Sequence, residues 1–125
     1  MPGVRVSEDH AWLRLEDDGS VTVGITTYAQ EQLGDIVFIE LPQIGQTVSS
    51  GDEAAVIESV KAAGDISVPV NGTVVEINQK LGDAPEIVNN DPFGEGWFFR
   101  MEVDDTSELD TLMSEDEYRE FIAGL

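Results

Sequence analysis

The sequence predicts an all-β fold with minor α content, in which two antiparallel sheets form a flattened barrel-sandwich. A short helix is expected near residues 27–33, and further helices at the C-terminus. Three observations support this prediction. Short runs rich in Val and Ile are separated by frequent Gly-Asp and Asn-Gly turn signals, which is typical of small sandwiches and barrels. An Asp-Gly dipeptide joins two alternating runs as in a hairpin. After residue 103 the apolar spacing changes from a strand period to a helix period.

The first elements expected are a hairpin and a helix. Residues 12–16 alternate between apolar and polar side chains, and residues 21–25 do the same after the Asp-Gly turn. Thr27 with Gln30 three residues later forms a capping-box pattern, which predicts that a short helix begins there. Gly34 follows the last residue of this helix and is suited to end it.

The middle of the chain predicts further strands. The apolar run 36–41 is nearly continuous, which favours a strand covered on both faces, and Pro42 ends it. Residues 54–60 and 66–70 alternate like two strands of one hairpin. Lys61 then falls at or beside the bend between them.

The last part of the chain is expected to be a loop, a strand and helices. Residues 89–96 consist of turn-forming types, and alternate apolar side chains over 97–103 share a strand face. Residues 109–113 have helical apolar spacing. Ser114 with Glu117 is a capping box for a final helix.

Length and composition indicate one domain over residues 1–125, with a β core over about 5–103 and a helical segment over about 106–123. Six Lys and Arg against 26 Asp and Glu give a net charge of -20, which disfavours nucleic acid and anionic membranes as partners. The sequence has neither an apolar run long enough to span a bilayer nor the apolar core of a signal peptide. These features predict a soluble intracellular protein, and the lack of an Arg-rich transit peptide favours a bacterial cytoplasm over a mitochondrial matrix. We expect a monomer in isolation.

The residues needed for catalysis are scarce. The chain has no cysteine, which excludes disulfides and thiolate chemistry of its own. His10 is its one histidine, and such a residue is more often a structural hydrogen-bonding group than a metal ligand. No glycine-rich phosphate loop precedes a helix. We therefore expect no catalytic residues and no metal site.

Lys61 is the residue that calls for a functional explanation. The only other lysine is Lys80, and small residues follow Lys61 at positions 62–64. An exposed, solubilising lysine is the ordinary explanation for such a position. The scarcity of lysine and the small neighbours favour an accessible amine with a specific use.

Several motifs resemble the H protein family of the glycine cleavage system. They are GITTYAQEQLGDIVFIELPQIG, ESVKAAGDI, VPVNG, VNNDPFGEGW and the helical tail ending in EYREF. The match runs from about Glu8 to Phe121, in the family's order. The lipoyl domains of 2-oxoacid dehydrogenases share the lysine hairpin but lack the GITTYAQ helix and the NNDPFGEGW loop. Biotin carriers flank their lysine with methionines, where this chain has Val60 and Ala62.

The resemblance implies that Lys61 carries lipoic acid in amide linkage, on an arm that reaches roughly 14 Å from the backbone. The chain would then shuttle the aminomethyl group of glycine from a pyridoxal-phosphate glycine decarboxylase to a tetrahydrofolate-dependent aminomethyltransferase. Dihydrolipoamide dehydrogenase would reoxidise it, and lipoate-attachment enzymes would load it. The chain itself would be a carrier and not an enzyme. Glu58 would contribute to recognition by these partners.

The resemblance also implies contacts to the loaded arm. Asp65 lies where the family places an aspartate, four residues after the lysine. The family commonly has a glutamate where this chain has Ala11, so Asp9 or Glu8 would have to substitute. Gly64 replaces a usual serine and is expected to loosen the bend after the lysine. On this view, Ala11→Glu would slow loss of the aminomethyl group from the isolated carrier.

Two alternatives remain open from the sequence. One is an H-like relay protein that donates lipoyl groups to other complexes, and the other is an unmodified acidic interaction module. A lipoyl group adds about 188 Da to the chain, so intact mass separates the module from the two carriers.

Overall fold

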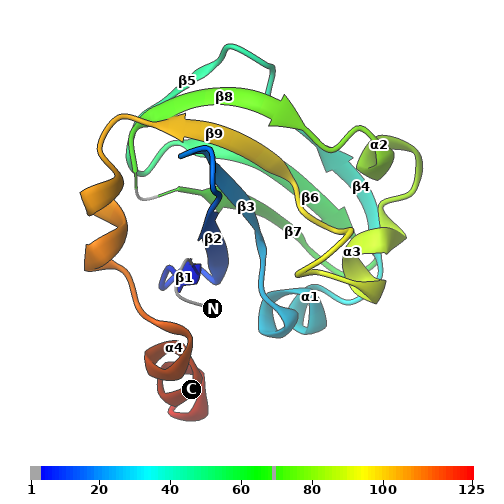
Figure 1. Cartoon of the computed structure of the whole chain (residues 1–125). Helices are drawn as coiled ribbons and strands as arrows, with labels where there is room; N and C mark the ends of the chain where they lie inside the picture. Colours follow the sequence, from blue (N-terminus) through cyan, green and yellow to red (C-terminus); the bar gives the residue numbers. More distant parts are fainter. Residues whose placement is uncertain (1–3, 69) are drawn as a thin grey trace.

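The computed structural model describes residues 4–68 and 70–125, which form two antiparallel sheets facing each other with short helices at their edges (Figure 1). The strands are β1 (Val4–Val6), β2 (Ala11–Leu15), β3 (Val21–Ile25), β4 (Ile36–Glu40), β5 (Thr47–Val48), β6 (Glu53–Ser59), β7 (Ala63–Ser67), β8 (Gly72–Ile77) and β9 (Phe99–Val103). The helices are α1 (Thr27–Leu33), α2 (Lys80–Asp83), α3 (Glu86–Asn90), the 3-10 helix η1 (Thr106–Thr111) and α4 (Glu115–Ala123). The larger sheet has the order β1-β2-β3-β9-β8-β5, and the smaller has the order β4-β6-β7. The predicted fold class is confirmed.

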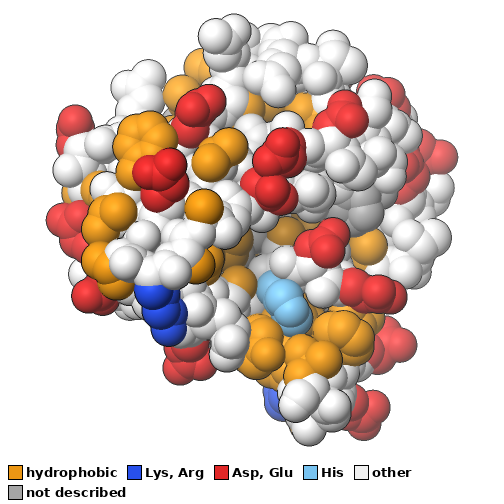
Figure 2. All heavy atoms as spheres, turned by 180° about the vertical axis from the view of Figure 1, so that it is seen from behind, with side chains coloured by type: hydrophobic (Ala, Val, Ile, Leu, Met, Phe, Trp, Pro, Cys, Tyr) orange, Lys and Arg blue, Asp and Glu red, His pale blue; other side chains and the backbone are white. Residues whose placement is uncertain are grey.

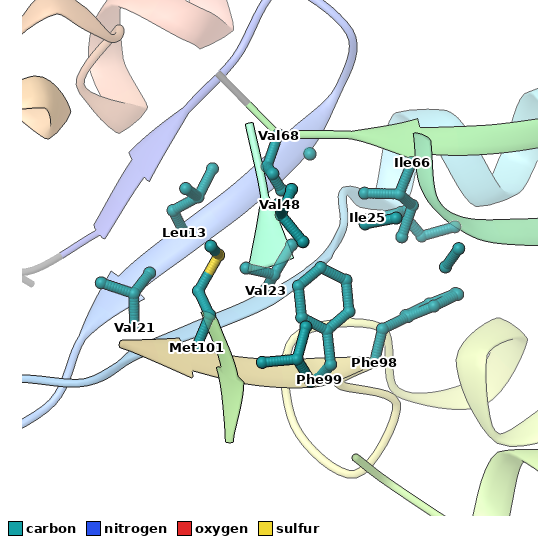
Figure 3. Close-up of a cluster of buried hydrophobic side chains, with 14 of the residues drawn as sticks. Leu13, Val21, Val23, Ile25, Val48, Ile66, Val68, Phe98, Phe99 and Met101 are labelled. Carbon is teal, nitrogen blue, oxygen red and sulfur yellow. The ribbon is translucent and has the colours of Figure 1, made fainter. Parts of the chain in front are cut away.

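The core lies between the two sheets (Figure 3). Leu13 and Val23 of the larger sheet and Ile66 of the smaller sheet are buried there, together with Phe98 and Phe99. Burial of these side chains supplies the main driving force for folding. The packed sheets thereby form a stiff scaffold that positions the loops and the hairpin tips.

The predicted β2–β3 hairpin is present. Leu15 pairs with Val21, and the turn between them contains Gly19 at φ 89°. The carboxylate of Asp18 accepts hydrogen bonds from the backbone N–H of Ser20 at 2.9 Å and from its hydroxyl at 2.6 Å. Turn chemistry therefore fixes the register of this hairpin.

Helix α1 has the predicted length, but its N-cap lies one residue earlier than predicted. The side chain of Thr26, not Thr27, accepts a hydrogen bond from the N–H of Ala29 at 3.2 Å. The sequence pattern favours Thr27, because Gln30 stands three residues later, but the side-chain oxygen of Gln30 accepts a hydrogen bond from Asn89 instead. Gly34 ends the helix as predicted, and its N–H donates to the carbonyl of Gln30 at 2.9 Å.

Strand β4 differs from the prediction that it is covered on both faces. Ile36 and Ile39 are buried, but Val37 and Phe38 are exposed. The pairing with β6 shifts register between Ile36 and Phe38, so Val37 is the extra residue of a β-bulge. A smaller sheet of three strands covers the core on one side only, which leaves its outer face in contact with solvent.

Helices α2 and α3 were not predicted from the sequence. Both are short, and neither has a side-chain hydrogen bond at its N-cap, so the usual start signal is missing. Helix α3 includes Asn89 and Asn90, the first two residues of the stretch predicted to be a loop. Among the described residues, no helix is long and apolar enough to cross a membrane.

The C-terminal segment follows the prediction closely. Ser114 and Glu117 form the expected capping box at the start of α4, with bonds of 3.2 and 3.0 Å. Before it, η1 buries Leu109, and Met113 pairs with Val6 of β1 in an isolated bridge. Helix α4 thus rests against the edge of the larger sheet at β1.

Candidate functional site

The β6–β7 hairpin presents Lys61 at its exposed tip. Glu58 pairs with Ala63, so the tip comprises only a few residues. The hydroxyl oxygen of Ser59 accepts hydrogen bonds from the N–H of Lys61 at 3.4 Å and from that of Ala62 at 3.0 Å. The same hydroxyl donates to the carbonyl of Ala62 at 3.0 Å. These bonds fix the backbone around Lys61, while its side chain stays exposed to solvent.

The hairpin tip is also attached to the segment that joins α1 to β4. The N–H of Val60 donates to the carbonyl of Asp35 at 3.0 Å. Gly34, at φ 77° and ψ -151°, lies under the lysine: a Cβ built on it would be 3.1 Å from the Cε of Lys61. This conformation is essentially restricted to glycine. A glycine at the end of α1 therefore leaves room for the lysine stem.

Asn89 of α3 holds in place the segment at the end of α1 that lies under Lys61, which we call the floor. Its Oδ1 accepts a hydrogen bond from the N–H of Ile36 at 2.9 Å, and its Nδ2 donates to the carbonyl of Gly34 at 2.8 Å. A further bond of 2.8 Å joins Nδ2 to the side-chain oxygen of Gln30. One half-buried amide thereby satisfies three groups around the end of α1, which gives the root of Lys61 a stiff support.

Asp65 lies on the outer face of the smaller sheet, where it pairs with Val56. A hydrogen bond between Glu53 and Asp65, and the repulsion between their carboxylates, raise the pKa of Glu53. Glu53 is the first residue of β6, at the end of the strand away from Lys61. The structure therefore brings Asp65 next to a second carboxylate, and its contact with a loaded arm stays a prediction.

Glu58 is exposed on the same outer face, two residues before the tip. It pairs with Phe38 on one side and Ala63 on the other. The predicted alternation holds from Ala55 to Glu58, where Ile57 is buried between Val56 and Glu58. It fails at Ala54 and Ala55, which are both buried beside a register shift in the pairing with β7. A role for Glu58 in recognition stays a prediction.

Asp9 lies in the turn between β1 and β2, beside His10. His10 adopts φ 69°, and its Nδ1 lies 2.7 Å from the hydroxyl of Tyr118 in α4. That hydroxyl is 2.8 Å from the Oγ1 of Thr26, the N-cap of α1. Partial burial lowers the pKa of His10, and this effect outweighs the opposing effect of the nearby Asp9 carboxylate, which raises it. Figure 2 shows the histidine, in pale blue, in a hollow of the surface beside apolar side chains.

His10 with its neighbours and Lys61 with its neighbours lie at opposite ends of α1. The N–H of Thr26 donates to the carbonyl of His10 at 3.0 Å, whereas Lys61 lies against Gly34 at the other end. A helix of seven residues is roughly 10 Å long. His10 and Lys61 are thus separated by about the length of α1, and a contact between Asp9 and the loaded arm stays a prediction.

Two departures from the family pattern acquire a structural explanation. Ala11 is only 2% exposed and belongs to the core, so a glutamate there would need a carboxylate to leave water. The Ala11→Glu variant is therefore a poor test of arm retention. Gly64 lies within β7, where it pairs with Ile57, and not in the bend. The prediction that Gly64 loosens the bend after the lysine is therefore wrong. The hydroxyl that fixes the tip comes from Ser59 instead.

Sequence reasoning missed three residues of this site, namely Ser59, Gly34 and Asn89. Ser59 stands two residues before the lysine, where a hydroxyl commonly bonds to nearby backbone, and this signal was available. For Gly34 the sequence predicts only that it ends a helix. For Asn89 it predicts a turn, because nothing local shows that this side chain bonds to residues more than fifty positions away.

Known proteins resemble this chain over nearly its whole length. A family model described as Glycine cleavage H-protein matches residues 4–124. The glycine cleavage system H protein of Psychrobacter cryohalolentis is 57% identical over 109 residues, which is 87% of this chain and 86% of that protein. That of Coprothermobacter proteolyticus is 51% identical over 122 residues, covering 98% of this chain and 96% of that protein.

A solved structure agrees with these sequence matches. The crystal structure of a glycine cleavage system H protein from Mycobacterium marinum has a TM-score of 0.87 and 36% identity to this chain, and the match covers 100% of both chains. Its fold agrees with the two sheets and the C-terminal helix described above. The chain therefore belongs to the glycine cleavage H-protein family.

Proposed function

We propose that this chain acts as one carrier domain that bears a lipoyl group on the amine of Lys61 and presents it to the enzymes of the glycine cleavage system. As an H protein, the chain is the lipoyl carrier of that system and not a catalyst. The observation that supports Lys61 as the attachment point is its place on an exposed tip whose backbone is fixed by Ser59 and by the carbonyl of Asp35.

The residues around Lys61 fit a long, covalently attached group. Ala62 and Ala63 are small and exposed, and Gly34 has no side chain under the lysine stem. The amine is therefore open to an attaching enzyme. A bulky residue at any of these positions would narrow the approach to it.

The chain's own task is to hold the root of the arm while the rest of the arm moves. A bound lipoyl group would supply a disulfide that accepts a carbon unit together with electrons. The stiff tip keeps the effective concentration of the arm high at a docked active site, because one end of the tether has no freedom of its own. Asp9 and Asp65 are the carboxylates that we propose to contact the loaded arm.

Lipoate-attachment enzymes and the three enzymes of glycine cleavage are the partners expected for such a carrier. We infer that these are the pyridoxal-phosphate glycine decarboxylase, the tetrahydrofolate-dependent aminomethyltransferase and dihydrolipoamide dehydrogenase. The net charge of -20 favours partner surfaces that carry Lys and Arg.

Intact mass of the protein produced in bacteria with working lipoyl attachment tests the site. We expect a gain of about 188 Da in the wild-type chain and in Lys80→Arg, and no gain in Lys61→Arg. Lys80 is the matched control, because it is the other lysine and is also exposed, with an ion pair to Glu95 at 3.3 Å. A gain of mass in Lys61→Arg would contradict the assignment.

Reconstitution separates glycine cleavage from a general lipoyl relay. The assay combines the loaded carrier with glycine, the decarboxylase, tetrahydrofolate and the aminomethyltransferase. We expect this mixture to produce carbon dioxide and folate-bound methylene. A carrier that gains the lipoyl mass but supports no turnover with any of these enzymes would favour the relay.

A further inference from the structure

Three large apolar side chains are exposed beside Lys61. Val37 is 54% exposed, Phe38 is 48% exposed and Val60 is 68% exposed. We call Val37, Phe38 and Val60 the bulge patch. Val60 precedes Lys61, and its N–H bonds to the segment that leads into β4. Phe38 pairs with Glu58 of β6, so the patch lies over the end of the smaller sheet next to the hairpin tip.

The β-bulge in β4 is the reason that two of these side chains point outward. In a regular strand, neighbouring side chains alternate between the two faces. Here Ile36 and Ile39 are both buried although three positions separate them, because Val37 is an extra residue in the pairing with β6. Bulges re-aim side chains in this way. The sequence keeps two apolar side chains at positions that the core does not use.

Carboxylates surround the bulge patch. Glu58 and Glu40 are exposed on the same outer face, and Asp35 is exposed just before β4. Figure 2 shows apolar side chains interspersed with carboxylates on the left of the view, where the molecule turned from Figure 1 presents β4 and β6. An apolar centre with an acidic rim is complementary to a surface with an apolar centre and a basic rim.

We propose that the bulge patch is the docking surface for the enzyme that acylates the Lys61 amine, an enzyme whose contact surface has an apolar centre ringed by Lys and Arg. This inference rests on the function proposed above. In the reaction, the neutral nitrogen of Lys61 forms an amide bond with an activated lipoyl ester. The ester's activating group leaves as an anion, and the nitrogen releases one proton.

The reach of the bare lysine selects this partner over the others. The Nζ of a lysine extends roughly 6 Å from its own Cα, so an enzyme acting on it must cover the residues directly beside the tip. The enzymes that act on the loaded arm meet its end roughly 14 Å away and need no close contact there. Val60 is the residue before Lys61, and Phe38 pairs with Glu58 three positions before it, so the bulge patch adjoins the area that only the first enzyme is forced to cover.

The test uses the unloaded full chain and a purified bacterial lipoate-attachment enzyme with its activated lipoyl donor. The variant combines Val37→Thr with Phe38→Thr, which keeps the β-branched shape or β propensity and removes apolar surface. Val75→Thr is the matched control: Val75 is also exposed and is also the extra residue of a bulge, on the larger sheet. The two readouts are the initial rate of mass gain and the Kd of the enzyme for chains that also carry Lys61→Arg.

We expect the double variant to raise the KM for the carrier at least tenfold with little change in kcat, and to weaken the Kd by a similar factor. The Val75→Thr control should stay within about twofold of wild type, a tolerance typical of exposed positions. Higher salt should weaken binding of the wild type, because the rim is charged. If the double variant loses its fold by circular dichroism, Val37→Thr alone serves, with the same direction of change.

Unchanged KM and Kd in a folded double variant would overturn the inference while leaving the carrier function intact. Normal attachment combined with a raised KM of the glycine decarboxylase for the loaded variant would also overturn it, because the patch would then serve another partner. Failure of the wild-type chain itself to gain mass would instead contradict the proposed function.

Discussion

Replacing Gly34 with alanine tests whether the floor under Lys61 depends on a glycine. Gly34 has φ 77° and ψ -151°, a region that residues with a Cβ populate only at a cost of about 1–3 kcal/mol. Alanine also restricts the unfolded chain, which returns about 0.4–1 kcal/mol. The new Cβ would meet the Cε of Lys61 at 3.1 Å, but the end of that flexible side chain can move aside.

The net loss expected for Gly34→Ala is therefore about 1–2 kcal/mol of unfolding free energy, nearly all of it from the backbone. For a chain of this size that corresponds to a fall in Tm of roughly 4–8 °C. Urea unfolding and a thermal scan measure it, and intact mass shows whether Lys61 is still modified. Attachment should persist, because the lysine remains at the exposed tip.

Gly82→Ala is the matched control for this experiment. Gly82 lies in α2, and nothing lies within 4 Å of a Cβ built there. Alanine in a helix should leave stability unchanged or raise it by up to about 1 kcal/mol. The reasoning would be refuted if Gly34→Ala and Gly82→Ala had the same Tm, since the two sites would then not differ in backbone strain.

Three further perturbations address the tip, its support and the histidine. Ser59→Ala should cost about 1 kcal/mol and speed hydrogen exchange at the Lys61 amide, and an unchanged exchange rate would count against the tip bonds. Asn89→Asp keeps an acceptor but loses the donor to the Gly34 carbonyl, so the unfolding free energy measured in urea should fall by about 1–3 kcal/mol. This loss should shrink at acid pH, because the protonated carboxyl can donate again. A loss that does not depend on pH would contradict this cause. The pKa of His10 is lowered in the folded protein, so as the pH drops below about 6.5 the unfolded chain binds a proton before the folded one, and the unfolding free energy should fall. In His10→Gln this dependence of stability on pH should be absent. Identical stability-versus-pH profiles for the variant and the wild type would refute the role of His10.

Local sequence patterns are sufficient to predict the features that depend on neighbouring residues. The β2–β3 turn, the capping box of α4 and the placement of Lys61 between two alternating runs all follow from interactions within a few positions. Such local signals act before any distant segment packs, so they can be read directly. The family motifs, which extend over most of the chain, added the lipoyl function to this outline.

Which faces are covered and what supports the lysine depend instead on packing between distant segments. The apolar run in β4 looked like a buried strand, yet Val37 and Phe38 face solvent because the three-stranded sheet has no layer outside it and a bulge turns them outward. Asn89 reaches Ile36 and Gly34 across 53 and 55 residues. Burial and long-range hydrogen bonds are relations between segments that the chain brings together only on folding, so no local pattern encodes them.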